Sequence, residues 1–153
     1  MHLECLSAQS IVIQPSLRTR LMKYNPGVSK IAYHLKYWGP AFLVMAVIFA
    51  FSSIPSVELP NFGLLDIFVK KGAHALGYGL LALSYLWGLK RERSKIESRL
   101  FFFAWFLATL YSASDEFHQS FVPGRHPAFT DVIIDSLGAA FVLFLVRKFL
   151  QQK

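Results

Sequence analysis

The sequence contains a single cysteine, Cys5, and few charged residues for its length. One cysteine excludes an intramolecular disulfide and any cysteine-rich metal centre. Charged residues make up 16% of the 153 residues, whereas hydrophobic residues make up 54%. So few charges cannot cover the surface of a water-soluble domain of this size, but helices in a bilayer present Leu, Phe and Val to lipid at little cost. The composition therefore favours a membrane protein.

The net charge of +7 does not indicate a nucleic-acid binder, because the basic residues lie in short clusters between long apolar runs. This pattern is typical of loops that face the cytoplasm and anionic lipid head groups. Thirteen of the 16 Lys and Arg residues fall within residues 1–36, 90–99 and 147–153. The other three, Lys70, Lys71 and Arg125, are expected on the opposite side of the membrane.

Four apolar segments predict four transmembrane helices, at about residues 37–54, 67–89, 100–119 and 131–150. With an even number of spans, the bias in basic residues places both termini in the cytoplasm. We therefore expect an all-α, polytopic membrane protein, a bundle of about four transmembrane helices with N-in/C-in orientation. Residues 1–36 are expected to form a cytoplasmic N-terminal tail, and residues 37–150 the transmembrane domain. No cleavage site follows the first apolar run, so that run is expected to remain as an anchor.

The start of the second segment is rich in small residues. Ala73 and Gly77, and likewise Ala75 and Gly79, lie four residues apart and share a helical face. Small residues at this spacing let a neighbouring helix approach closely. We expect this face to pack inside the bundle.

Most ionisable residues outside the cytoplasmic regions fall at the ends of segments two, three and four that share one membrane face. Asp115 lies roughly 23 Å along the third segment, at about 1.5 Å per residue, which places it in the outer leaflet. A charge near the bilayer centre costs at least about 2.5–3.5 kcal/mol unless it is paired or hydrated, so these polar faces are expected to converge on one extracytoplasmic pocket. The three faces hold Lys71, His74 and Tyr78; Asp115, His118 and Gln119; and Asp131, Asp135 and Gly138.

Each of these polar groups has a functional and a structural interpretation, and the sequence leaves both open. Asp115 and Glu116 are candidates for a catalytic or ligand-binding carboxylate pair that shares one proton, or for a solvated helix end. Lys71 and Arg125 are candidates for binding an anionic group, or for internal salt bridges to the acids. His74, which titrates near neutral pH, is a candidate acid or base, or a hydrogen-bonded core histidine.

No metal and no cofactor is expected, because the chain lacks an HExxH motif. His and carboxylate groups do bind Zn²⁺ or Mn²⁺, and the residues that supply them here are His74, Asp115, Glu116, His118 and His126. Pro123 and Gly124 are expected to form the turn that aims Arg125, with Gly124 at positive φ. The chain has neither a nucleophile motif nor a phosphate-cradling loop, so enzymatic activity stays open.

Two motifs lie in this polar region. The first is K-x-x-H-x-x-x-Y-x-x-L, formed by Lys71, His74, Tyr78 and Leu81, and the second is D-E-x-x-Q-x-F-x-P-G-R, formed by Asp115, Glu116, Gln119, Phe121, Pro123, Gly124 and Arg125. Over roughly residues 40–145 the chain resembles the VanZ-like family, named for an accessory factor of teicoplanin resistance. Asp131 and Gly138 also match the family pattern, whereas Asp135 stands where Asn is usual and Lys70 where an acid is common. The resemblance implies a polytopic protein of the cell envelope and a link to glycopeptide resistance.

We therefore expect a multi-pass protein of the bacterial cytoplasmic (inner) membrane whose pocket binds an anionic envelope lipid or cell-wall intermediate. Whether it modifies that ligand stays open, with His74, Asp115 and Glu116 as the catalytic candidates. Its expected partners are membrane lipids and this ligand, not nucleic acid, and its oligomeric state stays open. The alternative is a non-enzymatic transporter or a structural membrane subunit. The residues expected to bind the ligand are Lys71, His74, Tyr78, Asp115, Glu116, Gln119, Arg125, Asp131 and Asp135.

Overall fold

A computed structural model describes residues 26–56, 64–91 and 97–152. Within these residues the chain is all-α and has no strand, which confirms the predicted class. Its four α-helices are α2 (Pro26–Ser52), α3 (Leu64–Lys90), α4 (Ser98–Gln119) and α5 (Phe129–Gln151). The chain divides into two compact units, Met1–Tyr33 and His34–Lys153. Of the first unit, only the first turns of α2 are described. The helix packing and the cavities belong to the second unit.

The first helix begins earlier than the sequence predicted. Residues 26–36, which we assigned to a tail without sustained periodicity, are helical and continuous with the first apolar segment. Pro26 and Gly27 lie in the first turn, and after them good helix formers such as Lys30, Ala32 and Leu35 follow with no further Pro or Gly up to residue 36. Helix propensity therefore extends α2 beyond the apolar residues that a span requires.

Several predicted features lie outside the described residues. They are the basic tail as far as residue 25, most of the connection between the first two helices at 57–63, and the middle of the basic connection between α3 and α4 at 92–96.

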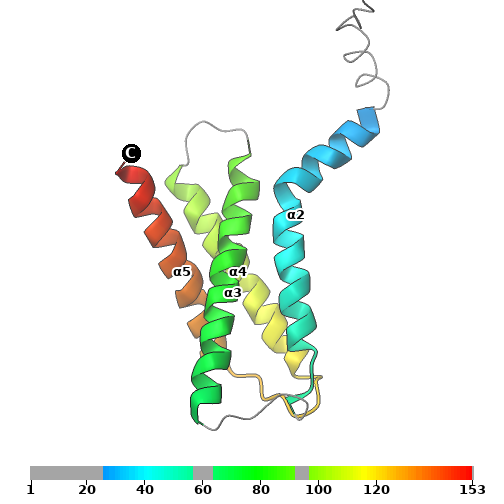
Figure 1. The fold of residues 1–153 in the computed structure, drawn as a ribbon, viewed down its shortest axis with the longest axis vertical. Coiled ribbons are helices and arrows are strands. Elements are labelled where there is room, and N and C mark those ends of the chain that lie inside the picture. The colour runs from blue at the N-terminus through cyan, green and yellow to red at the C-terminus, as the bar shows by residue number, and fades with distance from the viewer. Residues whose placement is uncertain (1–25, 57–63, 92–96, 153) are drawn as a thin grey trace, which may run out of the picture. The chain divides into compact units, whose positions relative to one another are not determined.

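Within the second unit, consecutive helices run in opposite directions (Figure 1). The C-terminal ends of α2 and α4 and the N-terminal ends of α3 and α5 lie together, at the bottom of Figure 1. We call this the polar end, since it holds Ser52, Lys71, Gln119 and Asp131. Helix α3 packs most extensively on α5, and α4 packs on both.

The closest approach in the bundle is between α3 and α5. A Cβ atom on Gly138 of α5 would lie 2.4 Å from the carbonyl oxygen of Ala75, and one on Gly79 of α3 would lie 2.6 Å from Val142 Cγ2. The expectation that Ala75 and Gly79 admit a neighbouring helix is therefore confirmed, and α5 is that helix. Ala104, Ala108 and Ser112 repeat the small-residue pattern on α4, where all three are buried.

Burial in this bundle is reversed relative to that of a water-soluble protein. The buried polar side chains include Ser52, Ser112, Asp115, Glu116, Gln119 and Asp135. Large apolar side chains are exposed along the helices, among them Leu43, Leu76, Phe102, Phe117, Leu137 and Phe141. Soluble monomers rarely expose so much apolar surface. The distribution is the one expected of helices surrounded by lipid.

Two segments of the described chain, Lys30–Ser52 and Phe129–Gln151, are long and apolar enough to cross a membrane. Helices α3 and α4 do not meet the same test, since α3 carries several glycines and two lysines and α4 carries the adjacent acids Asp115 and Glu116. These findings support a membrane protein. Whether α3 and α4 also cross the membrane depends on how deep in it their polar ends lie.

Gly138→Ala is expected to destabilise the protein by about 1–3 kcal/mol, because the new methyl group would overlap the backbone of α3 at Ala75. Gly72→Ala is the matched control. Nothing lies within 4 Å of its Cβ position, so higher helix propensity should stabilise that variant by about 0.5–1 kcal/mol. Thermal unfolding of the detergent-purified variants, followed by circular dichroism, measures both effects. A melting temperature of Gly138→Ala at or above that of the wild type would contradict the close α3–α5 contact.

Candidate functional site

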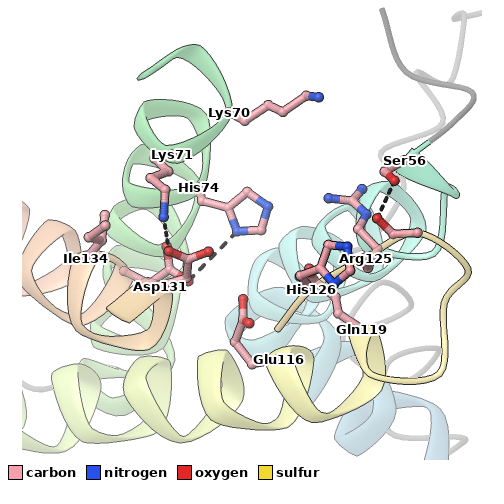
Figure 2. Close-up of a pocket in the computed structure, with 12 residues that line it drawn as sticks. Ser56, Lys70, Lys71, His74, Glu116, Gln119, Arg125, His126, Asp131 and Ile134 are labelled. Atoms are coloured by element: carbon pink, nitrogen blue, oxygen red, sulfur yellow. Dashed lines mark hydrogen bonds and ion pairs between the residues drawn. The ribbon is translucent and has the colours of Figure 1, made fainter. Parts of the chain in front are cut away.

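A polar pocket of about 480 Å³ lies at the polar end, between α3, α4, α5 and the loop that joins α4 to α5 (Figure 2). Its volume falls within the range of small-molecule sites. The structure brings together seven of the nine residues that we expected to bind a ligand: Lys71, His74, Glu116, Gln119, Arg125, Asp131 and Asp135. The pocket is also lined by Ser56, Lys70, Gly124, His126 and Ile134.

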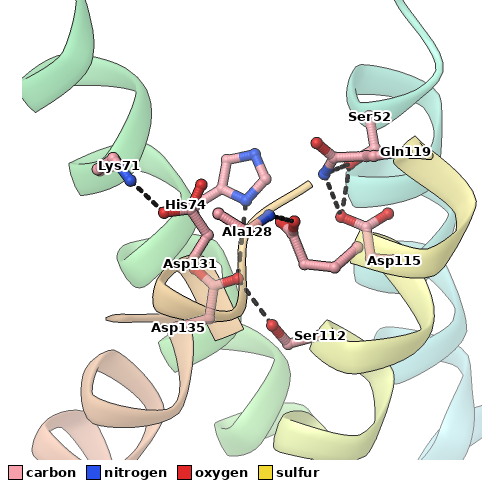
Figure 3. A network of polar contacts seen from close by, with 10 residues as sticks. Ser52, Lys71, His74, Ser112, Asp115, Gln119, Ala128, Asp131 and Asp135 are labelled. Carbon is pink, nitrogen blue, oxygen red and sulfur yellow. Dashed lines mark hydrogen bonds and ion pairs between the residues drawn. The ribbon is translucent and has the colours of Figure 1, made fainter. Parts of the chain in front are cut away.

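Lys71 forms an ion pair with Asp131 across the mouth of the pocket, joining α3 to α5 (Figures 2 and 3). Both side chains remain partly exposed, at 39% and 28%. An ion pair in contact with solvent stabilises a protein by less than about 1 kcal/mol. The pair therefore corresponds to the structural interpretation of Lys71, but it is weak enough to exchange for a bound anion.

Asp135 lies on the floor of the pocket and connects three helices (Figure 3). Its side chain is 2% exposed, and its Oδ2 atom accepts a hydrogen bond from Ser112 Oγ of α4 at 2.8 Å. The same oxygen lies 3.8 Å from His74 Nδ1 of α3. A buried carboxylate is costly unless donors surround it. The contacts of Asp135 therefore favour one arrangement of α3, α4 and α5.

Asp115 does not line the pocket but lies buried beside it, at 3% exposure. Its Oδ2 atom accepts hydrogen bonds from Ser52 Oγ of α2 at 2.7 Å and from Gln119 Nε2 at 3.0 Å (Figure 3). Ser52 is fully buried by this contact. Asp115 is therefore the buried carboxylate that links α4 to the end of α2.

Glu116, the neighbour of Asp115, has a separate partner. Its Oε2 atom accepts a hydrogen bond from the backbone N–H of Ala128 at 2.9 Å. Ala128 is the N-cap residue of α5 and offers no capping side chain of its own. A carboxylate suits this position, because it satisfies an otherwise unpaired N–H group near the positive end of the helix dipole. In the described residues the two carboxylates have separate partners and no hydrogen bond joins them; their role as a catalytic or ligand-binding pair stays a prediction.

Arg125 is aimed by a tight turn. Its backbone N–H donates to the carbonyl oxygen of Val122 at 3.1 Å, and Gly124 has φ = 71°, which confirms the predicted positive φ. Pro123 and Gly124 thus occupy the central positions typical of a type II turn. Among the residues that the structure describes, the guanidinium pairs with no acid. It donates to the carbonyl oxygen of Phe51 in the last turn of α2 at 2.9 Å and to that of Ile54, just after the helix, at 3.1 Å, where carbonyl groups have few helical partners.

Three buried polar atoms near the pocket have no hydrogen-bond partner among the described residues: the hydroxyl oxygen of Tyr78 and the Oδ1 atoms of Asp115 and Asp135. Tyr78 does not line the polar pocket and is 1% exposed. Its ring lies between those of His74 and Tyr111, with centroids 6.2 and 6.3 Å away. Each of the three atoms therefore belongs to a polar group held inside the bundle beside the pocket.

Of the three histidines that we considered for a metal site, His74 and His126 line the pocket and His118 does not. His118 stacks on Phe49 of α2, with ring centroids 4.4 Å apart, and its Nε2 atom lies 3.1 Å from Ser53 Oγ. His126 lines the mouth of the pocket. Within the described residues no group of three or more His, Cys, Asp or Glu side chains is arranged to hold a metal ion.

Sequence reasoning overlooked the buried serines. Ser112 lies three residues before Asp115, on the same helical face, so its spacing could have included it in the polar face of the third segment. Ser52 carries no such signal, because it ends an apolar run and its partner lies 63 residues away.

Glu116→Ala is expected to destabilise the start of α5 by about 1–2 kcal/mol, because the Ala128 N–H would lose its acceptor. Glu116→Gln keeps an acceptor oxygen and should cost clearly less. Hydrogen–deuterium exchange over residues 128–133 measures the local effect, and thermal unfolding measures the global one. Equal exchange in the wild type and in Glu116→Ala would show that the carboxylate does not hold this helix end.

Comparison with known proteins agrees with the two motifs of the polar pocket. The VanZ/LLP1 family matches the chain over residues 24–151, a range that includes all four helices in full. No curated protein and no solved structure matches the chain. The resemblance expected from the motifs at Lys71 and Asp115 is thus confirmed, and the chain belongs to the VanZ/LLP1 family.

Proposed function

We propose that this protein binds the anionic head group of an envelope lipid, or of a lipid-linked cell-wall intermediate, in the polar pocket. The observation that carries the proposal is the arrangement of charge between the mouth and the floor. Lys70, Lys71 and Arg125 are partly exposed at the mouth, whereas Glu116 and Asp135 are buried on the floor. An anion that approaches the pocket therefore meets cations first.

The acids of the pocket keep their charge, but their positions differ from those of the cations: Glu116 and Asp135 are buried, and Asp131 pairs with Lys71. Glu116 accepts from the α5 N-terminus, and Asp135 accepts from Ser112. Arg125 uses its Nε and one Nη2 donor on α2 carbonyls. A guanidinium has five N–H donors, so Arg125 retains donors for a phosphate or carboxylate oxygen.

The proposal includes a membrane arrangement. All four helices cross the bacterial cytoplasmic (inner) membrane, both termini lie in the cytoplasm, and the polar end opens toward the outer leaflet. Residues 1–36 precede the transmembrane domain of residues 37–150 as a cytoplasmic tail. Support comes from the exposed cations at the end opposite the pocket, which include Arg91, Arg99 and Lys148. The link to glycopeptide resistance that the family's name implies stays a prediction, and no reaction is assigned.

A non-enzymatic structural role is the second candidate, and it has its own observation. Arg125 and Glu116 hold the ends of α2 and α5 through backbone contacts. These two motif residues would therefore be needed for folding even without a ligand. Lys71 and Asp131, which contact no backbone group in the described hydrogen bonds, are better probes of binding.

Lys71→Ala is expected to reduce the affinity for anionic lipid roughly tenfold, because a charge-assisted contact is lost. Asp131→Asn should raise the affinity for anionic lipid, since it releases Lys71 from its ion pair. Lys148→Ala removes an equal charge at the far end of α5 and is the matched control. Native mass spectrometry of the purified variants with phosphatidylglycerol measures all three. If Lys71→Ala and Lys148→Ala bound the lipid as the wild type does, the pocket would not be an anion site.

Cysteine labelling tests the membrane arrangement separately. In a Cys5→Ser background, Phe121→Cys, at an exposed position in the loop after α4, should react with a membrane-impermeant maleimide on intact cells. Arg91→Cys, exposed at the end of α3, should react only after the membrane is permeabilised. The reverse pattern would overturn the proposed orientation, and labelling of both positions on intact cells would overturn the number of spans.

A further inference from the structure

A second cavity, of about 290 Å³, lies between α2 and α3. We call it the apolar groove. One wall consists of Val47, Ile48 and Phe51 of α2, and the other includes Ala73 and Gly77 of α3. These side chains are apolar or absent and offer nothing to a charged ligand. A cavity lined in this way accommodates hydrocarbon.

The apolar groove and the polar pocket meet at one side chain. His74 lines both cavities. On the groove side, the next residue on the same helical face is Tyr78. A molecule that extended from one cavity into the other past His74 would therefore need a polar end and an apolar end.

The groove exists because α2 and α3 are held together unevenly. Away from the polar end they pack closely, since a Cβ atom on Gly88 would lie 3.1 Å from the Trp38 ring. Midway along α3, where the groove lies, the approach is looser, since a Cβ atom on Gly77 would be in ordinary van der Waals contact with Ile48 at 3.9 Å. The end of α2 is fixed at the polar end by Asp115 and by the loop after α4, through contacts that do not involve α3.

The groove also borders the apolar exterior of the bundle. Val47 and Phe51 are exposed although they line the groove. A hydrocarbon chain could thus enter sideways from a surrounding bilayer without crossing water.

We propose that the ligand is an amphiphile that places its anionic head group in the polar pocket and one hydrocarbon chain in the apolar groove, with His74 at the junction. This inference rests on the proposed function, because it takes the head-group site from it. It adds that the protein binds the hydrocarbon chain of the ligand as well as its head group.

Gly77→Leu tests the groove, because its side chain would occupy the space that faces Ile48. The probes are palmitoyl-oleoyl phosphatidylglycerol and dihexanoyl phosphatidylglycerol, which share a head group, together with the two phosphatidylcholines of the same chains. Binding to the detergent-purified full chain is measured by native mass spectrometry. Gly72→Leu, the same change in open space on the same helix, is the matched control. Val47→Trp fills the groove from α2 and replaces Gly77→Leu if that variant does not fold.

The wild type and Gly72→Leu are expected to bind the long-chain phosphatidylglycerol more tightly than the short-chain one. Gly77→Leu should lose this preference while its short-chain affinity stays unchanged. The displacement of only two methylene groups corresponds to roughly tenfold weaker binding. Equal binding of both phosphatidylglycerols by the wild type, or a preference that survives in Gly77→Leu and Val47→Trp, would overturn the chain site and leave the head-group site standing. Short-chain phosphatidylglycerol that binds no better than short-chain phosphatidylcholine would overturn the proposed function itself.

Discussion

The arrangement of this bundle depends on burying carboxylates among helices whose outer surfaces are apolar. Asp115 and Asp135 are almost fully buried, and neither can leave its protein donors without a large desolvation cost. Asp115 accepts hydrogen bonds from α2 and α4, whereas Asp135 of α5 accepts one from α4 and lies 3.8 Å from His74 of α3. Two buried acids therefore connect all four helices at one end. Packing of small residues, such as Gly138 against Ala75, brings α3 and α5 close enough for this network to form.

The same constraint explains why residues that hold helix ends also line the polar pocket. Helix ends carry unpaired backbone groups, and one end of each of the four helices lies at the polar end of the bundle. Arg125 satisfies carbonyl groups at the end of α2, while Glu116 satisfies an N–H group at the start of α5. Both side chains also line the pocket. A pocket built from helix ends is rigid at its rim, which favours binding because little further ordering is needed when a ligand enters.

Much of the fold and part of the site followed from the sequence. Apolar runs predicted the helices to within a few residues, except at the start of α2, where helix propensity continued past the apolar residues. The spacing of Lys71 and His74, and of Asp131 and Asp135, correctly placed side chains on shared faces that line one pocket. The same reasoning expected Asp115 and His118 in the pocket, but both lie against the end of α2 instead, where Asp115 bonds to Ser52 and His118 stacks on Phe49. A helical face is broad enough to contact two neighbours, and spacing alone does not say which.

The sequence by itself determined the family, the helical class, the positive φ of Gly124 and the residue types available to the pocket, because motifs, hydropathy and turn chemistry are local properties of the chain. Only the tertiary structure decided which partner each polar group takes. Asp115 pairs with Ser52, Lys71 with Asp131, and Arg125 with the Phe51 carbonyl, across 63, 60 and 74 residues of sequence. Several acids and cations were available to each of these groups. The packing of α3 on α5, of α4 on both and of the end of α2 on α4 selected among the alternatives by bringing only some of them within hydrogen-bonding distance.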